Sequence, residues 1–218
     1  MSVTHTSSPA GKIVLFRSLF RGRAEVYPAR FESVKTGKAG YSPVCGNEWV
    51  RGVCEKPRIK CSDCPHQKWL PVTDDVIRRH LSGVDERGRP FVAGVYPMLL
   101  DEHCFFLAVD FDEGDWAADA RAFLETCGRL KVPAVLERSR SGEGGHVWVF
   151  FAEAIPAALA RKLGAHVLTE TMERRPEAEM KSYDRFFPNQ DTLPRGGFGN
   201  LIALPLQKGA REKGNSVF

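Results

Sequence analysis

The chain of 218 residues lacks long apolar segments, a secretion signal and low-complexity tracts. Its longest apolar runs, such as Cys104 to Val109, are much shorter than the roughly 20 residues of a membrane-spanning helix. The polar segment from Met1 to Gly11 has no apolar stretch of the kind that directs secretion. These absences exclude membrane-spanning, fibrous and disulfide-scaffold classes, and we expect a cytoplasmic protein that does not contact a membrane.

Charge is nearly balanced in total but uneven along the chain. Apolar residues make up 43% and charged residues 27%, which is typical of a globular domain. Residues 1–72 hold 12 Lys or Arg and 5 Asp or Glu, residues 73–194 hold 15 and 21, and residues 195–218 hold 4 and 1. An acidic middle between basic ends fits metal-binding carboxylates beside a surface that meets phosphates, although an ordinary solvated surface gives the same pattern.

Four of the six cysteines are grouped: Cys45, Cys54, Cys61 and Cys64. The last two are separated by two residues, a spacing that lets both thiolates face one ion. Because this segment has few apolar residues, we expect a structural Zn²⁺ bound by the four sulfurs in a module over residues 41–70. An iron–sulfur cluster uses the same four ligands and is an alternative to zinc, and His66 could replace one of the sulfurs. Disulfides are a further alternative, but the expected cytosolic location argues against them. Cys104 and Cys127 lie among apolar residues and are expected in the core.

The spacing of apolar residues predicts a mixed α/β core. Helices are expected over residues 12–22, from Thr73 to Leu81, from Asp115 to about Arg129 and from Pro156 to about Glu173. Strands are expected over residues 24–31, 92–96, 104–111, 132–137, 146–151, 181–187 and 200–204, and residues 32–70 are expected to be loop and cysteine module.

The most specific motif is an acidic pair at the end of an apolar strand. Asp110 and Asp112 are two residues apart, so their side chains share one face of the strand. Two adjacent carboxylates repel each other unless a cation lies between them, and hard oxygen ligands favour Mg²⁺ or Mn²⁺. Glu113 and Asp115 follow in a turn and are expected to be solvated or to cap a helix.

A second motif is a turn rich in serine and glycine that ends in a histidine. Gly142, Gly144 and Gly145 let backbone N–H groups approach an anion closely, and Ser141 and His146 add side-chain donors. Arg138 and Arg140 add positive charge. This composition suits a triphosphate, although the Gly-Lys-Ser/Thr ending of a Walker loop is missing. Taken alone, the turn could equally be a flexible hairpin with a structural histidine.

A third motif combines an acidic strand with a later polar and apolar segment. Asp184 follows Tyr183 in an expected strand and is a candidate third carboxylate, while Asp191 lies in a turn and is the weaker candidate. Asn200, Gln207 and Lys208 surround the next apolar strand. Either aspartate could be a plain turn residue.

In this order, the three motifs resemble those of the archaeo-eukaryotic primase superfamily, closest to the primase-polymerases of TOTE conflict systems and of CRISPR-associated type. The cysteine module and the segments 94–97 and 199–207 are similar as well, so the resemblance covers residues 12–210. The resemblance implies a single catalytic domain with an RRM-like core packed on a smaller N-terminal α/β layer. It implies an active site in the cleft between the two and a four-cysteine zinc-binding insertion at the rim.

The resemblance also implies the chemistry, which is primer synthesis from NTP or dNTP on a single-stranded DNA template. Asp110, Asp112 and Asp184 would hold two Mg²⁺ or Mn²⁺ ions. Triphosphate binding would fall to Arg140, Ser141, Gly142, Gly145, His146 and Lys208, of which Arg140 and Lys208 are argued from charge and position alone. A helicase or CRISPR adaptation proteins are expected partners in a full system. Two alternatives remain: a metal-dependent nuclease, and a non-catalytic zinc-containing module that binds single-stranded nucleic acid.

Overall fold

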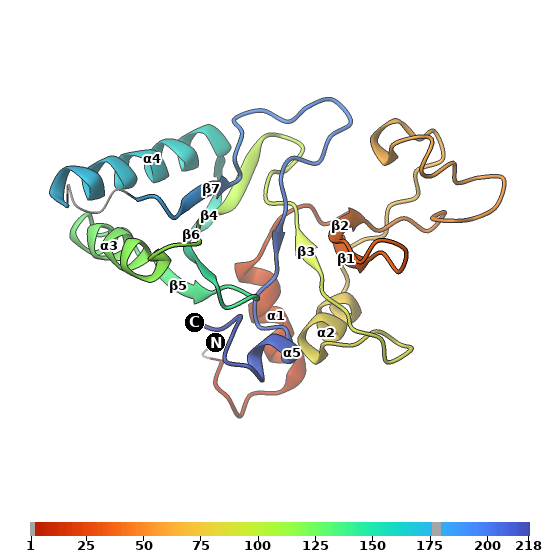
Figure 1. The fold of residues 1–218 in the computed structure, drawn as a ribbon, viewed down its shortest axis with the longest axis horizontal. Helices are drawn as coiled ribbons and strands as arrows, with labels where there is room; N and C mark the ends of the chain where they lie inside the picture. The colour runs from red at the N-terminus through yellow and green to blue at the C-terminus, as the bar shows by residue number, and fades with distance from the viewer. Residues whose placement is uncertain (1–2, 176–179) are drawn as a thin grey trace.

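The computed structural model describes residues 3–175 and 180–218 of the chain (Figure 1). Along the sequence its elements are α1 Pro9–Leu19, β1 Pro28–Glu32, β2 Ala39–Pro43, the 3-10 turn η1 Cys61–Asp63, α2 Asp74–Ser82, β3 Gly94–Val95, β4 His103–Asp112, α3 Trp116–Arg129, β5 Val135–Arg138, β6 Gly144–Pro156, α4 Ala157–Arg174, β7 Tyr183–Phe187, β8 Ile202–Ala203 and α5 Lys208–Arg211. The described part is therefore a mixed α/β structure with five α-helices, and its strands pair in antiparallel sheets.

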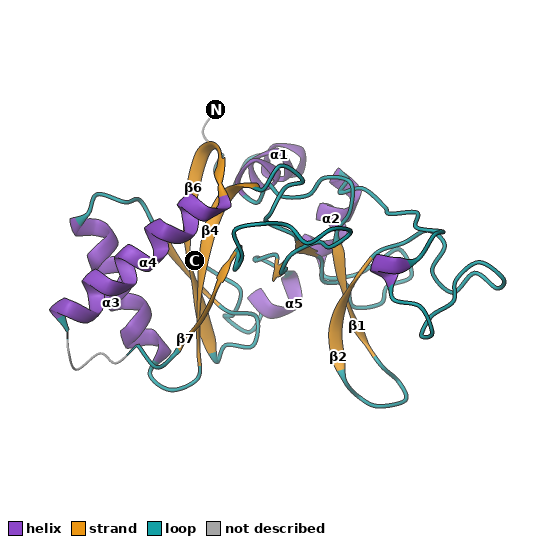
Figure 2. Cartoon of the chain, turned by 90° about the horizontal axis from the view of Figure 1, so that it is seen from above, coloured by secondary structure: helices purple, strands orange, loops and turns teal. Residues whose placement is uncertain are grey.

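The central element is a four-stranded sheet with the order β5-β6-β4-β7, in which all neighbours are antiparallel. Alternation along the strands divides the core into two clusters. Leu107 and Val109 of β4 pack with α3 and α4 on one face, whereas Phe106 and Ala108 pack with the N-terminal elements on the other. Figure 2 shows α3 and α4 together on one side of the sheet and α1, α2, β1 and β2 on the opposite side.

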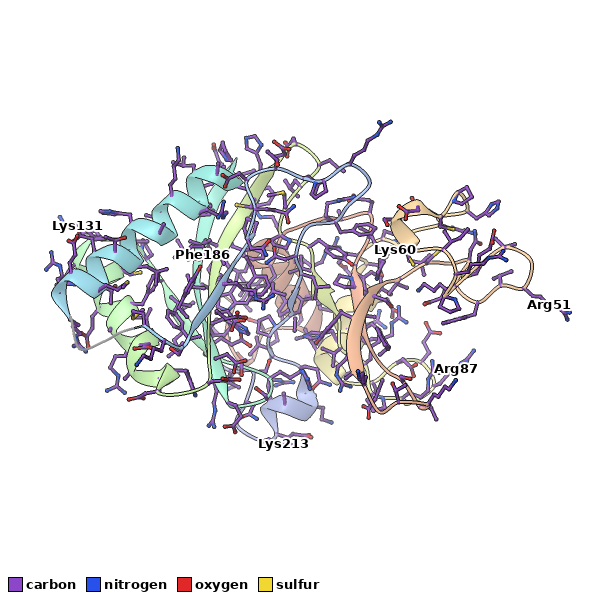
Figure 3. All side chains as sticks on the ribbon, turned by 45° about the horizontal axis from the view of Figure 1, so that its top comes forward. Arg51, Lys60, Arg87, Lys131, Phe186 and Lys213 are labelled. Carbon is purple, nitrogen blue, oxygen red and sulfur yellow. The ribbon has the colours of Figure 1, made fainter. Side chains whose placement is uncertain are left out.

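The N-terminal half adds two small sheets beside the central one. β1 pairs with β2, and β3 pairs with β8 from the far end of the chain. The cysteine-rich segment extends from β2 away from the central sheet, and Figure 3 places its Arg51 at the opposite end of the molecule from Lys131. No helix in the described ranges is both long and apolar enough to cross a membrane.

Local capping signals set the ends of several helices where the sequence places them. The Thr73 side chain accepts a hydrogen bond from the N–H of Val76 at the start of α2, and Asp115 does the same for Ala118 at the start of α3. Gly83 ends α2 in the left-handed region at φ 81°. The helix starts predicted at Thr73 and Asp115 are confirmed, whereas the end at Gly83 was not predicted. Helix starts can be predicted from the sequence because a cap involves only neighbouring residues.

Other boundaries differ from the sequence-based predictions. α1 begins at Pro9 rather than at residue 12, because Ser8 caps it and proline suits the first turn. Residues 32–70 were expected to be loop but contain β2, which is a strand because it pairs with β1. α5 was not predicted, since one helical turn carries too short a periodic pattern to detect.

Candidate active site

Four charged or titratable side chains form one row across the central sheet. In the strand register, Glu137 of β5 lies opposite His146 of β6, His146 lies opposite Asp110 of β4, and Asp110 lies opposite Arg185 of β7. The His146 Nε2 atom is 3.5 Å from Asp110 Oδ1, and its Nδ1 atom is 2.9 Å from Glu137 Oε2. We call these four residues the cross-strand row. It joins the acid of the first sequence motif to the histidine of the second.

A β-bulge in β7 brings an acid of the third motif to the same face. Phe111 pairs with Tyr183 and Asp110 with Arg185, so that the register shifts by one residue at Asp184. A bulge redirects side chains, and here Asp184 contributes to the electrostatic field at Asp110. The Asp184 carboxylate also accepts a hydrogen bond of 2.7 Å from Arg185 Nε. Without the bulge, strict alternation would turn Asp184 towards α3 and α4.

Asp112 lies two residues beyond Asp110, at the exposed end of β4. It pairs with Gly144 of β6, where a Cβ atom would lie 2.6 Å from the Phe111 carbonyl oxygen and 3.0 Å from Asp112 Oδ1. The missing side chain at Gly144 thus makes room for the Asp112 carboxylate. A surface pocket begins at Asp112 and continues over the start of α3 to Arg175 and Lys181.

Burial and the neighbouring charges shift the pKa of two members of the cross-strand row. The pKa of Asp110 is raised chiefly because burial disfavours the ionised form; His146 opposes this shift, and the charges of Asp184 and Asp112 add to it. For His146, burial lowers the pKa, but the hydrogen bond and charge of Glu137, with the charges of Asp110 and Asp112, outweigh burial and raise it. The neighbouring acids thus favour the protonated form of the His146 ring, whereas burial disfavours the ionised form of Asp110.

The turn between β5 and β6 is held in shape by hydrogen bonds that leave part of it exposed. Ser141 Oγ lies 3.0 Å from Ser139 Oγ and accepts from the Glu143 N–H at 3.3 Å. Gly142 has a positive φ of 89°, which a side chain would strain, and its carbonyl oxygen accepts two hydrogen bonds from Arg138. Arg140 is exposed, and its charge lowers the pKa of Tyr41 in β2, which burial raises. The turn therefore faces the N-terminal hairpin.

A comparison with protein families gives a match over nearly the whole chain. Residues 11–218 match the model of the TOTE conflict system, archaeo-eukaryotic primase domain. The chain belongs to this archaeo-eukaryotic primase family. A search of curated proteins finds no match. Family membership confirms the resemblance seen in the sequence and points to a primase-type nucleotidyltransferase.

Two candidate site residues predicted from the sequence of this primase domain, Lys208 and Asp191, contact other elements rather than the cross-strand row. Lys208 begins α5, where its ammonium group is 3.7 Å from Glu212 and its Cβ packs beside Gly83 at the end of α2. Asp191, the weaker candidate for the third acid, forms an ion pair with Arg161 of α4. Of the two acids considered in the third motif, Asp184 is therefore the one that the sheet brings to Asp110.

The four grouped cysteines of the primase domain line one small cavity. Cys45 Sγ accepts a hydrogen bond from the Lys68 N–H at 3.4 Å, and Cys64 Sγ accepts one from the His66 N–H at 3.4 Å. All four are free thiols, as are Cys104 and Cys127 in the core. Across residues 3–175 and 180–218, no group of three or more His, Cys, Asp or Glu side chains stands in an arrangement that could hold a metal ion.

Sequence reasoning missed several residues around the site. Glu137 was counted only as the end of a strand, and Arg185 was not considered although it follows Asp184 directly. Asn215 donates to the Ser141 carbonyl oxygen at 3.2 Å from the C-terminal segment. Glu137 directly precedes Arg138, the first residue of the serine-glycine motif, but no local pattern in the sequence indicated that its side chain is buried.

Proposed function

We propose that the chain is a template-directed primase-polymerase, which starts nucleic-acid chains without a primer and extends them from nucleoside or deoxynucleoside triphosphates. The observation that carries the proposal is the cross-strand row with the adjacent bulge. Together they bring an acid of the first motif and an acid of the third motif towards the histidine that ends the second motif. A nuclease would need the clustered acids, but an anion-binding turn beside them suits a triphosphate substrate.

Asp110, Asp112 and Asp184 are the proposed ligands of Mg²⁺ or Mn²⁺. Their carboxylate oxygens are the hard ligands that these ions prefer, and burial of Asp110 makes a cation partner favourable. Because Asp184 is paired with Arg185, the proposal requires Asp184 to exchange that contact for an ion. Two bound ions would activate a 3′-hydroxyl group and neutralise the triphosphate and its leaving pyrophosphate.

The chain's own residues would bind and orient the triphosphate. His146, with its raised pKa, offers a charged ring donor beside Asp110. The Ser141 hydroxyl is an exposed donor of the turn, and Arg140 adds charge where β2 approaches. The N–H groups of Gly142 and Glu143 donate to the Ser139 carbonyl oxygen and to Ser141 Oγ, so the proposal requires them to exchange these bonds for the triphosphate. Lys208 is kept as a weaker candidate because its neighbours belong to α2 and α5.

The cysteine module is proposed to hold a structural Zn²⁺. The donor chemistry fits, since four thiols line one cavity and two of their sulfurs already accept backbone N–H groups. Their arrangement in the described residues is not that of a closed metal site, so the proposal requires the thiols to move together around the ion. Lys56 hydrogen-bonds with Glu48 and Cys61, which places a positive charge beside a potential thiolate. A bound ion would supply folding energy to a segment composed largely of turns. Metal analysis of the purified protein distinguishes a bound Zn²⁺ from an iron–sulfur cluster, which uses the same cysteine ligands.

Single-stranded DNA is the proposed template. The N-terminal 72 residues carry an excess of positive charge, which attracts phosphates. Within the cysteine module, the Trp49 side chain is 69% exposed, and the Lys56 ammonium group lies 5.9 Å from its ring centre. An exposed aromatic ring next to cations is a suitable surface for an unpaired base.

A primer-synthesis assay tests the proposal. Purified protein is incubated with single-stranded template, Mn²⁺ or Mg²⁺, and labelled nucleotides, and the products are separated by length. Asp110→Asn and Asp112→Asn should each lower the rate by at least about 100-fold, because ion-mediated stabilisation of the transition state is worth several kcal/mol. Asp101→Asn is the matched control, since Asp101 precedes the opposite end of β4 and is 69% exposed.

The same assay separates the alternatives. Loss of template without new products would identify a nuclease, and tight template binding without turnover would identify a binding module. Triphosphate affinity, measured with a non-hydrolysable analogue, should fall in His146→Ala for a polymerase. Wild-type protein that gives no product with either metal and does not bind the analogue would refute the proposal.

A further inference from the structure

Glu137 is a buried acid that none of the sequence motifs includes. Its side chain is 2% exposed. Its Oε2 atom accepts a hydrogen bond of 3.0 Å from Trp148 Nε1 and lies 2.9 Å from His146 Nδ1, while its Oε1 atom accepts one of 3.4 Å from Ser216 Oγ. Both carboxylate oxygens are thus paired, as a buried carboxylate requires.

These contacts define how the His146 ring is oriented. The indole Nε1–H of Trp148 is a donor only, so Oε2 of Glu137 is an acceptor. The Nδ1 atom of His146 meets the same oxygen and therefore carries a hydrogen that it donates to Glu137. A flipped ring would place a carbon atom against Glu137 and lose this bond. Nε2 is left facing Asp110, 3.5 Å from its Oδ1 atom.

We propose that Glu137 is a positioning residue, which holds the His146 ring with Nδ1–H towards the core and Nε2 towards the triphosphate. The proposal rests on the proposed function for the identity of the ligand at Nε2. Glu137 itself does not reach that ligand, because it is buried on the far side of the ring. The arrangement follows a general rule for functional histidines, in which the bond made by one ring nitrogen decides the role of the other.

The C-terminal segment completes the support around Glu137. Ser216 bonds to Glu137, and its N–H group donates to the Ser139 carbonyl oxygen at 3.3 Å. Val217 pairs with Arg138 at the edge of β5, and Asn215 donates to the turn at Ser141. Residues 215–217 therefore brace both the acid and the turn, so that the histidine and the backbone donors keep one relative placement.

A purely structural role predicts something different. If Glu137 serves only to satisfy Trp148 and Ser216 in the core, its loss would lower stability without changing the ring protonation pattern of His146. If Glu137 positions His146, that pattern changes in a variant that remains folded. Long-range ¹H–¹⁵N NMR of the histidine rings reports which nitrogen carries hydrogen, without any requirement for activity.

Two substitutions of Glu137 by side chains of nearly equal size distinguish the positioning role from the purely structural role. Glu137→Gln keeps an acceptor oxygen for His146 and Trp148, and its amide can donate to Ser216. Glu137→Met keeps the length of the side chain but offers no comparable acceptor. Glu153→Gln is the matched control, because it makes the same chemical change at an exposed position of β6.

In the wild type and in Glu137→Gln, we expect a hydrogen on Nδ1 of His146. In Glu137→Met we expect Nδ1 of His146 to lose its hydrogen in a substantial fraction of the molecules, and affinity for a non-hydrolysable triphosphate to fall about tenfold or more, the usual effect of losing one charge-assisted hydrogen bond. Glu153→Gln should match the wild type in both measurements. Melting temperatures of all four proteins identify any variant that has unfolded.

A wild-type His146 with bare Nδ1 would overturn the proposal, even if Glu137→Met failed to fold. A folded Glu137→Met that keeps both the wild-type ring pattern and the wild-type affinity would also overturn it. The distribution of hydrogen on the His146 ring nitrogens could change as expected while the protein binds no triphosphate. That result would support the positioning role of Glu137 and refute the proposed function.

Discussion

His80 is a fully buried histidine on α2, and we expect it to make folding stability decrease in acid. Its Nδ1 atom accepts a hydrogen bond of 3.1 Å from the Ala93 N–H, and its Nε2 atom lies 2.9 Å from the Pro205 carbonyl oxygen. The ring is therefore neutral, with its hydrogen on Nε2. Burial lowers the pKa of His80 to about 4; the bond to Pro205 opposes this shift and the charge of Arg211 adds to it.

The size of the effect follows from the difference between folded and unfolded states. In the unfolded chain, His80 should titrate near the ordinary histidine pKa of about 6.5. The unfolded state therefore takes up a proton first as the pH falls, and stability is lost between about pH 6.5 and pH 4. From pH 7 to pH 5 the free energy of unfolding should decrease by about 2 kcal/mol on account of this residue.

Urea unfolding at pH 7 and pH 5, followed by tryptophan fluorescence, measures this decrease. His80→Gln can keep both hydrogen bonds, since its amide oxygen accepts and its amide nitrogen donates, but it does not titrate. The variant should therefore lose about 2 kcal/mol less than the wild type over this pH range. His5→Gln, at an exposed position, should behave like the wild type. Equal losses in the wild type and His80→Gln would refute the reasoning.

Three further predictions concern the template surface, the turn and the cysteines. Trp49→Ala should weaken binding of single-stranded DNA by about 1–3 kcal/mol in a fluorescence-anisotropy titration, with little change in melting temperature; unchanged affinity would exclude stacking at this ring. Gly145→Ala should destabilise the fold by about 1–3 kcal/mol in urea unfolding, because its Cβ would lie 2.6 Å from the ring of the tryptophan that begins α3. A strong zinc chelator should release four thiols to rapid reaction with Ellman's reagent. Cys104 and Cys127 should stay unreactive in the folded protein, since burial raises their pKa values to about 12 and about 11; thiols that react equally fast before chelation would argue against a bound metal.

The sequence predicts the parts of this fold that depend on neighbouring residues. Thr73 and Asp115 cap their helices because a cap involves only the next few backbone N–H groups. The acids Asp110 and Asp112 could be placed on one face of a strand because alternation is a property of every strand. The family resemblance, carried by three motifs in order, is confirmed over residues 11–218.

Register and burial of charge could not be predicted in the same way. The bulge at Asp184 arises from pairing with β4, more than seventy positions earlier in the chain, and no local pattern marks it. Glu137 ends an apolar run and looks like a solvated strand end. Its burial depends on Ser216, which is 79 positions away in the sequence. Long-range pairing therefore decides which of the acids face one another.

The bracing role of residues 215–217 has a practical consequence for producing the protein. An affinity tag joined after Phe218 would begin two residues after Val217, which pairs with Arg138. Steric crowding by such a tag would affect the edge of β5, close to the proposed nucleotide site. Kinetic measurements should therefore be made on material whose tag has been cleaved off.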